Sequence, residues 1–177
     1  GQTVAIKTFL KLAFNHPSYM NRLNLEVKIM NQMDHHGVIK LYEVFEDDRF
    51  VYLIQEYAEN GDMLSLLKRV RCLKEAKFLP TLKQVVQTIA YVNSKNVLHR
   101  DIKLDNILLT GKGQAKLCDF GISTFVNADE LLFEHIGTPA YLAPEIIKEE
   151  GYSGFKIDVW SLGVTAFIAL TGHGPFI

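Results

Sequence analysis

The hydrophobic pattern of the first third of the chain is typical of strands and one helix. Three short runs are rich in β-branched, aromatic and other apolar residues: residues 4–7, 38–45 and 50–57. The polar residues 46–49 separate the last two runs and predict a hairpin turn. Apolar side chains within residues 19–33 recur at helical spacing, which predicts a helix with one buried face. We therefore expect a small β-rich unit that contains one helix.

The remainder of the chain has mainly helical periodicity. Residues 58–62, Ala-Glu-Asn-Gly-Asp, interrupt the apolar pattern and predict a linker. Beyond the linker the sequence predicts helices at 63–70 and 82–94, strands at 107–109 and 115–117, a long loop over 125–138, a short helix after Pro144 and an apolar helix near Trp160. A β-rich unit followed by a helical one predicts an α+β fold with two lobes around a cleft at the linker.

Composition and charge narrow the function classes. Apolar residues make up 48% of the 177 residues and the net charge is −1, so no basic field favours a nucleic-acid partner. The apolar run at residues 159–170 is too short for a membrane span and predicts a buried helix. Cys72 and Cys118 have neither CxxC nor zinc-site spacing, so we expect free thiols in a reducing compartment. These features predict an intracellular protein, cytoplasmic or nuclear.

Residues 99–106, His-Arg-Asp-Ile-Lys-Leu-Asp-Asn, place charged and amide side chains between two apolar segments. The apolar flanks are expected to be strands that fix a loop with a polar tip. The carboxylate of Asp101 and the amide of Asn106 make this loop a candidate site for chemistry. The alternative is an Asx-type turn that only connects the two strands.

Four motifs occur in a fixed order along the chain. They are Val4-Ala5-Ile6-Lys7, His99-Arg100-Asp101 followed by Asn106, Asp119-Phe120-Gly121, and Ala143-Pro144-Glu145. Together they resemble the signature set of the protein kinases, and the resemblance covers nearly the whole chain. It implies the bilobal protein-kinase fold, with a partial small lobe at 1–57, a hinge at 58–62 and a partial large lobe at 63–177.

The same resemblance implies the reaction and its cofactors, ATP and Mg²⁺. A protein kinase transfers the γ-phosphate of ATP to a protein hydroxyl, mainly by positioning and charge neutralisation. Asp101 would accept the proton of the substrate hydroxyl, and Lys103 would neutralise the transferring phosphate. Lys7 would hold the α- and β-phosphates and pair with Glu26, although a surface lysine and a solvated helix glutamate are the alternative. The magnesium ligands would be Asn106 and Asp119.

The linker would be the hinge that binds the adenine ring. Gln55 would guard the back of the adenine pocket, and backbone groups of Glu56 and Ala58 would bond the adenine edge. Asp62 would meet the ribose. Two apolar side chains would sandwich the ring from the two lobes: Ala5 and Leu108. Ordinary core packing is the alternative role for these two residues.

Other residues would support the site without taking part in the chemistry. Four side chains would stack across the lobes and align them in the active state: Met30, Leu41, His99 and Phe120. Asp158 would brace the catalytic loop by accepting hydrogen bonds from backbone N–H groups near His99 and Arg100, because a carboxylate beside an apolar helix must be satisfied.

Residues 119–145 would form the activation segment, which is a site of regulation in this family. Arg100 requires an anionic partner, which in many relatives is a phosphothreonine three residues before the glycine of Gly137-Thr138-Pro139. Glu134 occupies that position here, and residues 125–137 contain no serine, threonine or tyrosine. We hypothesise that Glu134 replaces the phosphate and pairs with Arg100. The alternative is a solvated loop glutamate.

Two features favour the serine/threonine branch of the family. Lys103 follows Asp101 by two residues, and Thr138 is expected to hydrogen-bond near both. Residues 41–46 and 170–176 are most similar to the calmodulin-dependent and AMP-activated kinase group. Two acidic residues stand where basophilic relatives meet an arginine, so protein substrates with basic residues upstream of the phosphosite are expected: Asp62 and Asp105.

The resemblance also implies segments that this chain lacks. A glycine-rich phosphate loop would precede Lys7, and further helices would follow Ile177, so we expect a central fragment that is truncated at both ends and inactive alone. The alternatives are a pseudokinase or scaffold that uses the fold for binding, and a metal-dependent hydrolase built from Asp101 and Asp119. The four chemical residues are all present, which favours the kinase: Lys7, Asp101, Asn106 and Asp119.

Overall fold

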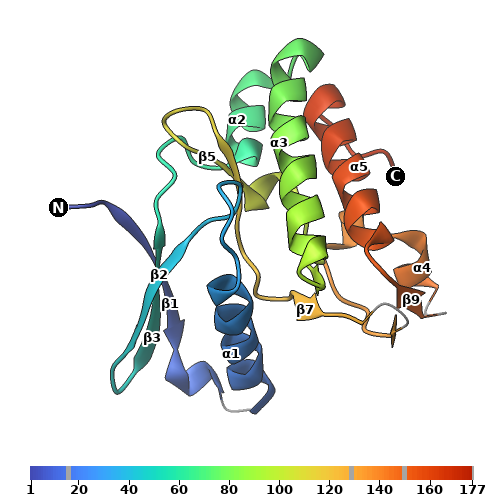
Figure 1. Ribbon diagram of the computed structural model, residues 1–177. Coiled ribbons are helices and arrows are strands. Elements are labelled where there is room, and N and C mark those ends of the chain that lie inside the picture. Colours follow the sequence, from blue (N-terminus) through green and yellow to red (C-terminus); the bar gives the residue numbers. More distant parts are fainter. Residues whose placement is uncertain (15–16, 128–129, 149–150, 177) are drawn as a thin grey trace.

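The computed structural model describes residues 1–14, 17–127, 130–148 and 151–176. It has a β-rich lobe and a helical lobe (Figure 1). The β-rich lobe is a three-stranded antiparallel sheet in the order β1-β3-β2, with one helix beside it. Its elements are β1 (Val4–Leu10), η1 (Lys11–Phe14), α1 (Pro17–Asn31), β2 (Leu41–Glu46) and β3 (Phe50–Glu56). The predicted α+β architecture with two lobes is confirmed.

The predicted hairpin between β2 and β3 is present, and a local hydrogen-bond network explains its tight turn. Oδ1 of Asp47 accepts from the backbone N–H groups of Arg49 and Phe50, each at 2.7 Å. Asp47 also donates its own backbone N–H to the carbonyl of Phe50 at 2.9 Å. Aspartate favours such turns because its short side chain bonds backbone groups two or three residues further on.

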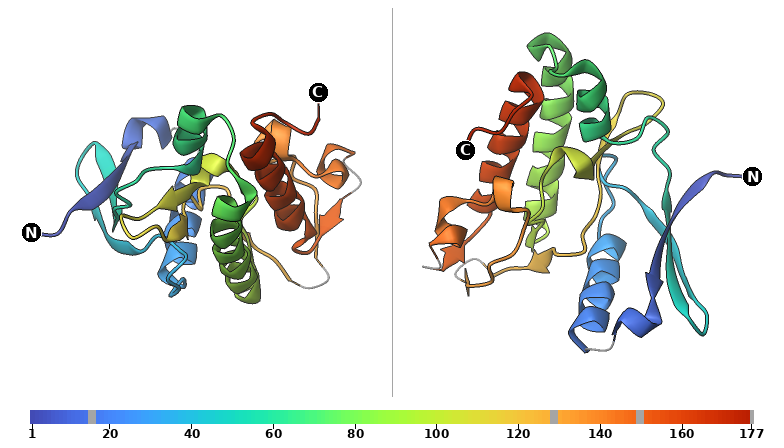
Figure 2. Two further views of the ribbon diagram at one scale, coloured as in Figure 1. Left: turned by 90° about the horizontal axis from the view of Figure 1, so that it is seen from above. Right: turned by 180° about the vertical axis from the view of Figure 1, so that it is seen from behind.

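The helical lobe contains three main helices, of which α3 and α5 lie side by side (Figures 1 and 2). Its helices are α2 (Met63–Val70), α3 (Glu75–Ser94), α4 (Pro144–Ile147) and α5 (Lys156–Thr171). The start predicted for α3 was wrong, because the helix begins at Glu75 and continues through Pro80. Phe78 explains the difference, since its side chain is buried in the main core and draws the first turns onto the lobe.

Three further pairs of short strands complete the described strands. They are β4 (Val97–Leu98) paired with β7 (Thr124–Phe125), β5 (Ile107–Leu109) paired with β6 (Ala115–Leu117), and β8 (Leu131–Leu132) paired with β9 (Tyr152–Ser153). Two 3₁₀ turns complete the described elements: η2 (Leu104–Asn106) and η3 (Pro139–Tyr141). The segment predicted as a loop over 125–138 is mostly irregular, but it also carries the end of β7 and all of β8.

One hydrophobic core joins the two lobes. It contains Ile29 and Met30 of α1, Leu117 of β6 and Phe120, together with residues of α2, α3 and α5. The connection between α1 and β2 approaches α3 so closely that a Cβ atom at Gly37 would lie 1.9 Å from Oγ1 of Thr88. A side chain at this position would therefore require Thr88 or the connection itself to shift.

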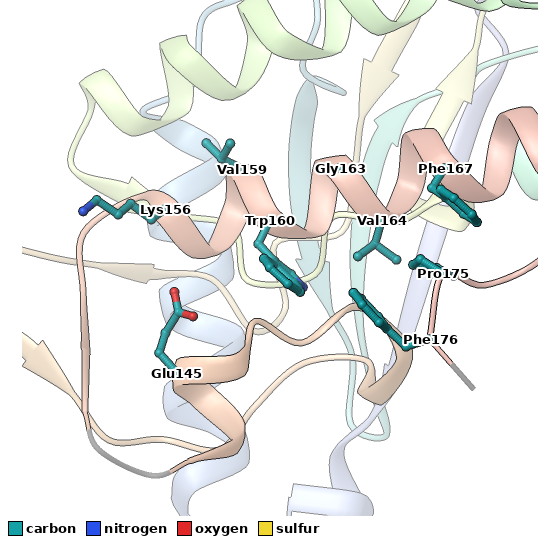
Figure 3. A pocket seen from close by; sticks show the side chains of 9 residues that line it. All are labelled: Glu145, Lys156, Val159, Trp160, Gly163, Val164, Phe167, Pro175 and Phe176. Carbon is teal, nitrogen blue, oxygen red and sulfur yellow. The ribbon is translucent and has the colours of Figure 1, made fainter.

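An apolar cavity of about 500 Å³ lies along α5 (Figure 3). Trp160 and Phe176 stack beside it, with ring centroids 5.6 Å apart. Its lining is mainly apolar, and Glu145 and Lys156 are its charged residues. None of the helices in the described ranges combines the length and apolar character needed to cross a membrane.

Candidate active site

A cavity of about 360 Å³ lies where the sheet meets β5 and the segment that follows β6. Seven residues predicted from the sequence line it: Ala5, Lys7, Gln55, Glu56, Asn106, Leu108 and Asp119. The lining also includes three residues without a predicted binding role: Ile6, Ile39 and Cys118. The structure therefore brings together residues from three of the four sequence motifs and two residues that directly precede the hinge, Gln55 and Glu56.

Lys7 forms the charged centre of this cavity. Its Nζ lies 2.8 Å from Oε1 of Glu26 in α1 and 2.8 Å from Oδ1 of Asp119. The ion pair with Glu26 is the one predicted from the sequence, and the contact with Asp119 was not predicted. The Glu26 carboxylate is 2% exposed, so Lys7 supplies the positive charge that its burial requires.

Burial and the ion pairs act in opposite directions on the pKa values of this cluster. Burial raises the pKa of Glu26 and outweighs the lowering effect of Lys7. Burial lowers the pKa of Lys7, but the two carboxylates together raise it above its ordinary value. Burial raises the pKa of Asp119, yet Lys7 and the backbone N–H of Gly121 bring it below the ordinary value. Asp119 is therefore held as a carboxylate, the form that binds a cation.

Three side chains hold Asp101: two from the loop at residues 99–106, which we call the catalytic loop, and Thr138 from the activation segment. The amide of Asn106 donates to Oδ2 of Asp101 at 2.9 Å, and Lys103 Nζ lies 2.8 Å from the same oxygen. Oδ1 accepts from the hydroxyl of Thr138 at 2.6 Å, and Lys103 donates to that hydroxyl at 2.8 Å. The bonds predicted for Thr138 are thus present. They fix the Asp101 carboxylate in one orientation.

The backbone is strained at Arg100 in this loop and at Asp119 in the segment after β6, and Asp158 braces the loop. Arg100 has φ 66° and Asp119 has φ 63°, a region that residues with a Cβ rarely adopt. The carboxylate of Asp158 accepts from the backbone N–H of His99 at 3.0 Å and of Arg100 at 2.9 Å. Asn93 donates to the same carboxylate at 3.2 Å. The hydrogen bonds predicted for Asp158 are therefore present, and they stabilise the strained backbone conformation of Arg100.

One ring contact of the predicted stack between the lobes is present, and the other members lie in or against the main core. The rings of His99 and Phe120 meet edge to face with centroids 4.9 Å apart. Phe120 and Met30 are buried in the main core, and Leu41 packs against it. Nε2 of His99 lies 3.0 Å from the carbonyl oxygen of Cys118. Burial lowers the pKa of His99, whose ring is fully buried and hydrogen-bonded in the core.

The hinge residues differ in how far the structure supports their expected roles. Gln55 and Glu56 line the cavity, and Gln55 Nε2 lies 3.5 Å from the sulfur of Met30. Ala58 is buried in the core. The Asp62 carboxylate caps α2, accepting from the N–H and the hydroxyl of Ser65 at 2.7 Å each. Both oxygens of Asp62 therefore have a local structural role, and the ribose contact stays a prediction.

Glu134 connects three separate segments. Its carboxylate forms an ion pair with Arg100 of the catalytic loop and lies 3.7 Å from Nη2 of Arg22 in α1. The Arg100 side chain is 3% exposed, whereas that of Glu134 is 52% exposed. The hydrogen bond from Arg100 lowers the pKa of Glu134 below its ordinary value. The predicted pairing is present, and the contact with Arg22 was not predicted.

The oxygen atoms of Asn106 and Asp119 suit a cation whose coordination shell a bound phosphate would complete. Within residues 1–14, 17–127, 130–148 and 151–176, no three His, Cys, Asp or Glu side chains gather as a metal site of their own. Asn106 uses its amide nitrogen on Asp101, which leaves its oxygen for a ligand beside the Asp119 carboxylate. One carboxylate and one amide oxygen suit Mg²⁺, which usually takes few protein ligands and completes its shell with phosphate and water.

Two basic residues near the site were not predicted from the sequence. Arg22 reaches Glu134, and Lys116 is buried with its Nζ 2.9 Å from the Glu56 carboxylate. Lys116 has a weak sequence signal, because it is a charged residue inside an apolar strand run. Arg22 has none, since an arginine on a helix is ordinarily solvated.

Comparison with known proteins agrees with this geometry. The chain is 37% identical to CBL-interacting protein kinase 30 of Oryza sativa subsp. japonica, 40% to serine/threonine-protein kinase PLK4 of Nematostella vectensis and 34% to the NUAK family SNF1-like kinase 2 of Homo sapiens. Each match covers 99% of this chain but only 38%, 18% and 28% of the respective relative. The chain thus spans well under half of these proteins. All of residues 1–177 match the protein kinase domain, and the chain belongs to the protein kinase family.

Proposed function

We propose that the protein containing this chain is an ATP-dependent serine/threonine protein kinase. The observation that carries the proposal is the meeting of Lys7, Asn106 and Asp119 in one cavity, with Asp101 hydrogen-bonded to Asn106. Phosphoryl transfer needs positioned charge more than covalent chemistry, and these residues supply it. The alternative of a non-catalytic scaffold has no observation in its favour.

Each residue has a distinct part in the proposed reaction. Bound Mg²⁺ would neutralise charge on the phosphates of ATP, with Asn106 and Asp119 as its protein ligands. Lys7 would bind the α- and β-phosphates while Glu26 fixes its ammonium group. The Asp101 carboxylate would orient the substrate hydroxyl and accept its proton, and Lys103 would face the transferred phosphate.

Adenine would bind between the lobes at the hinge. Ala5 and Leu108 line the cavity from the two lobes, which supports their role as the apolar faces of the adenine site. Backbone groups of Glu56 and Ala58 would bond the adenine edge, and Gln55 would close the back of the pocket.

The substrate preference follows from the surroundings of Asp101. Thr138 links the catalytic loop to the activation segment beside the position where a serine or threonine hydroxyl would lie. Asp105 is exposed, which supports a contact with a basic residue upstream of the phosphosite. Asp62 supports this contact less, because Ser65 occupies its carboxylate.

The active arrangement is held without a phosphate in this proposal. Glu134 joins Arg22 of α1 to Arg100 of the catalytic loop, and α1 also carries Glu26, the partner of Lys7. An anionic side chain in this position does what a phosphothreonine does elsewhere, which is to neutralise a buried arginine and order the segment. We therefore propose that the kinase is active without phosphorylation of its activation segment.

Free Cys72 and Cys118 support a reducing compartment.

Transfer of radiolabelled phosphate to a protein substrate tests the activity directly. The full-length protein should label the substrate, and the Asp119→Ala and Asp101→Asn variants should lose at least about 100-fold of the rate. Asp48→Ala is the matched control, because it removes an exposed carboxylate in the hairpin turn. Equal labelling by the full-length protein and by both active-site variants would show that this site does not carry the reaction.

A further inference from the structure

A buried lysine that the proposed chemistry does not use lies beside the hinge. Lys116 of β6 is only 7% exposed. Its Nζ lies 2.9 Å from Oε2 of Glu56 and donates to the backbone carbonyl of His36 at 2.7 Å. Lysine is almost never buried unless it is paired, because the ammonium group loses its hydration. Both contacts are therefore needed to keep this side chain inside the protein.

These contacts bridge the two lobes. Lys116 belongs to the β5–β6 hairpin of the helical lobe, Glu56 ends β3 of the sheet, and His36 lies between α1 and β2. The backbone alongside follows the same path, since Leu117 donates to the carbonyl of Gly37 at 2.7 Å and accepts from the N–H of Ile39 at 2.9 Å. The lysine therefore lies at the junction of the lobes.

Glu56 connects this junction to the nucleotide cavity. The residue lines that cavity, while its carboxylate is held by Lys116 and accepts from the backbone N–H of Lys40 at 3.3 Å. The cross-strand partner of Lys116 is Leu108, which also lines the cavity. Directly opposed residues of an antiparallel pair project to the same face, so Lys116 and Leu108 both face the hinge side of the hairpin.

We propose that Lys116 is a positioning residue for the nucleotide. By fixing the Glu56 carboxylate, Lys116 holds the hinge backbone at a fixed distance from Leu108. The space for the adenine ring is therefore ordered before ATP binds. The proposal rests on the proposed function in taking ATP as the ligand. Without the lysine charge, the hinge would be less ordered, and the nucleotide would have to order it on binding, which weakens affinity.

The test compares Lys116→Met with the parent in the full-length protein. Methionine keeps most of the side-chain length and removes the charge. Backbone amides of residues 54–60 should exchange with deuterium faster in the absence of nucleotide. The dissociation constant of MgATP, measured by calorimetry, should rise about five- to tenfold, the low end of couplings between sites that share an element. The KM for ATP should rise likewise with kcat unchanged.

Two further variants make the test specific. Lys112→Met removes an exposed lysine from the turn of the same hairpin and should change neither hinge exchange nor ATP affinity. Glu56→Leu removes the carboxylate that pairs with Lys116, keeps the bond from Lys116 to His36 and should reproduce both effects of Lys116→Met, so it decides the matter if that variant does not fold. The double variant should bind ATP no more weakly than Lys116→Met alone, since both changes break one contact.

The outcomes separate this proposal from the proposed activity. Unchanged hinge exchange and ATP affinity in both single variants would overturn the role of Lys116, even if their melting temperatures fall, because a purely structural lysine gives that result. Faster hinge exchange and weaker ATP binding in a protein that transfers no phosphate would uphold the role of Lys116 and overturn the kinase activity.

Discussion

The hydroxyl of Thr138 donates a hydrogen bond to Oδ1 of Asp101 at 2.6 Å, across 37 residues of sequence. The same hydroxyl accepts from Lys103 Nζ at 2.8 Å, so the activation segment is part of the network that orients the proposed base. The orientation of Asp101 therefore depends on a residue outside the catalytic loop.

Thr138→Val should lower kcat by roughly 10- to 100-fold, because misplacement of a catalytic group by about 1 Å can cost that much. Valine keeps the shape of threonine but can neither donate to Asp101 nor accept from Lys103. Steady-state phosphate transfer at saturating ATP measures the effect, and Thr138→Ser should retain most of the rate. A Thr138→Val protein with the parental kcat would show that the hydroxyl does not orient Asp101.

Lys7→Met should lower both activity and stability. The Glu26 carboxylate is 2% exposed and would lose its cation, which should cost about 2 kcal/mol of unfolding free energy, less than for a fully buried pair because Lys7 is 33% exposed. Urea unfolding measures the stability. Lys11→Met is the matched control, since Lys11 pairs with the exposed Glu46 and its loss should cost under about 1 kcal/mol. Equal losses in the two variants would contradict the special status of Lys7.

Glu134→Gln should lower the activity of protein that carries no phosphate on its activation segment, because Arg100 would lose its anionic partner. Glu130→Gln changes a nearby glutamate whose carboxylate accepts hydrogen bonds from Asn127 within its own turn, and it should have no such effect. Phosphate transfer by protein treated with a phosphatase, with mass spectrometry to verify its state, measures both. Parental activity in Glu134→Gln would support the view of Glu134 as a solvated loop residue.

The Arg100–Glu134 pair also predicts a pH dependence. The hydrogen bond from Arg100 lowers the pKa of Glu134 from an ordinary value of 4.5. A carboxyl whose pKa is lower in the folded protein stabilises it above the unfolded pKa and loses that contribution as the pH falls through the folded pKa. The stability difference between the parent and Glu134→Gln should therefore be full at neutral pH and shrink below about pH 4.5. A difference that grows on acidification would contradict the pairing.

Removal of magnesium should weaken nucleotide binding through Asp119. MgATP should raise the melting temperature of the parent by several degrees, because a ligand at 100 times its dissociation constant stabilises by about 2.7 kcal/mol. Chelation with EDTA should remove most of that rise. In Asp119→Asn the rise should be small with or without magnesium. A parental, magnesium-dependent rise in Asp119→Asn would exclude Asp119 as a metal ligand.

The sequence by itself determined the features that depend on local pattern or on motif chemistry. Apolar runs located β3 and the β5–β6 hairpin, and helical repeats located α1 and α2, because these elements bury apolar side chains. The polar residues 46–49 predicted a turn, and the side chain of Asp47 stabilises that turn by accepting hydrogen bonds from the backbone of Arg49 and Phe50. The four motifs identified Lys7, Asp101 and Asp119, because positioned charge at fixed places is what phosphoryl transfer requires.

Only the tertiary structure decided the features that depend on contacts between distant segments. The start of α3 follows from the burial of Phe78 in the core. The two-residue strands β4 and β7 form because they pair with each other across a long stretch of sequence that includes the catalytic loop. Arg22 and Lys116 gained their roles from Glu134 and Glu56, which lie far from them in sequence. A side chain on a helix or strand has the same local pattern whether solvent or a distant carboxylate faces it, so only the folded chain separates a solvated charge from one that joins two lobes.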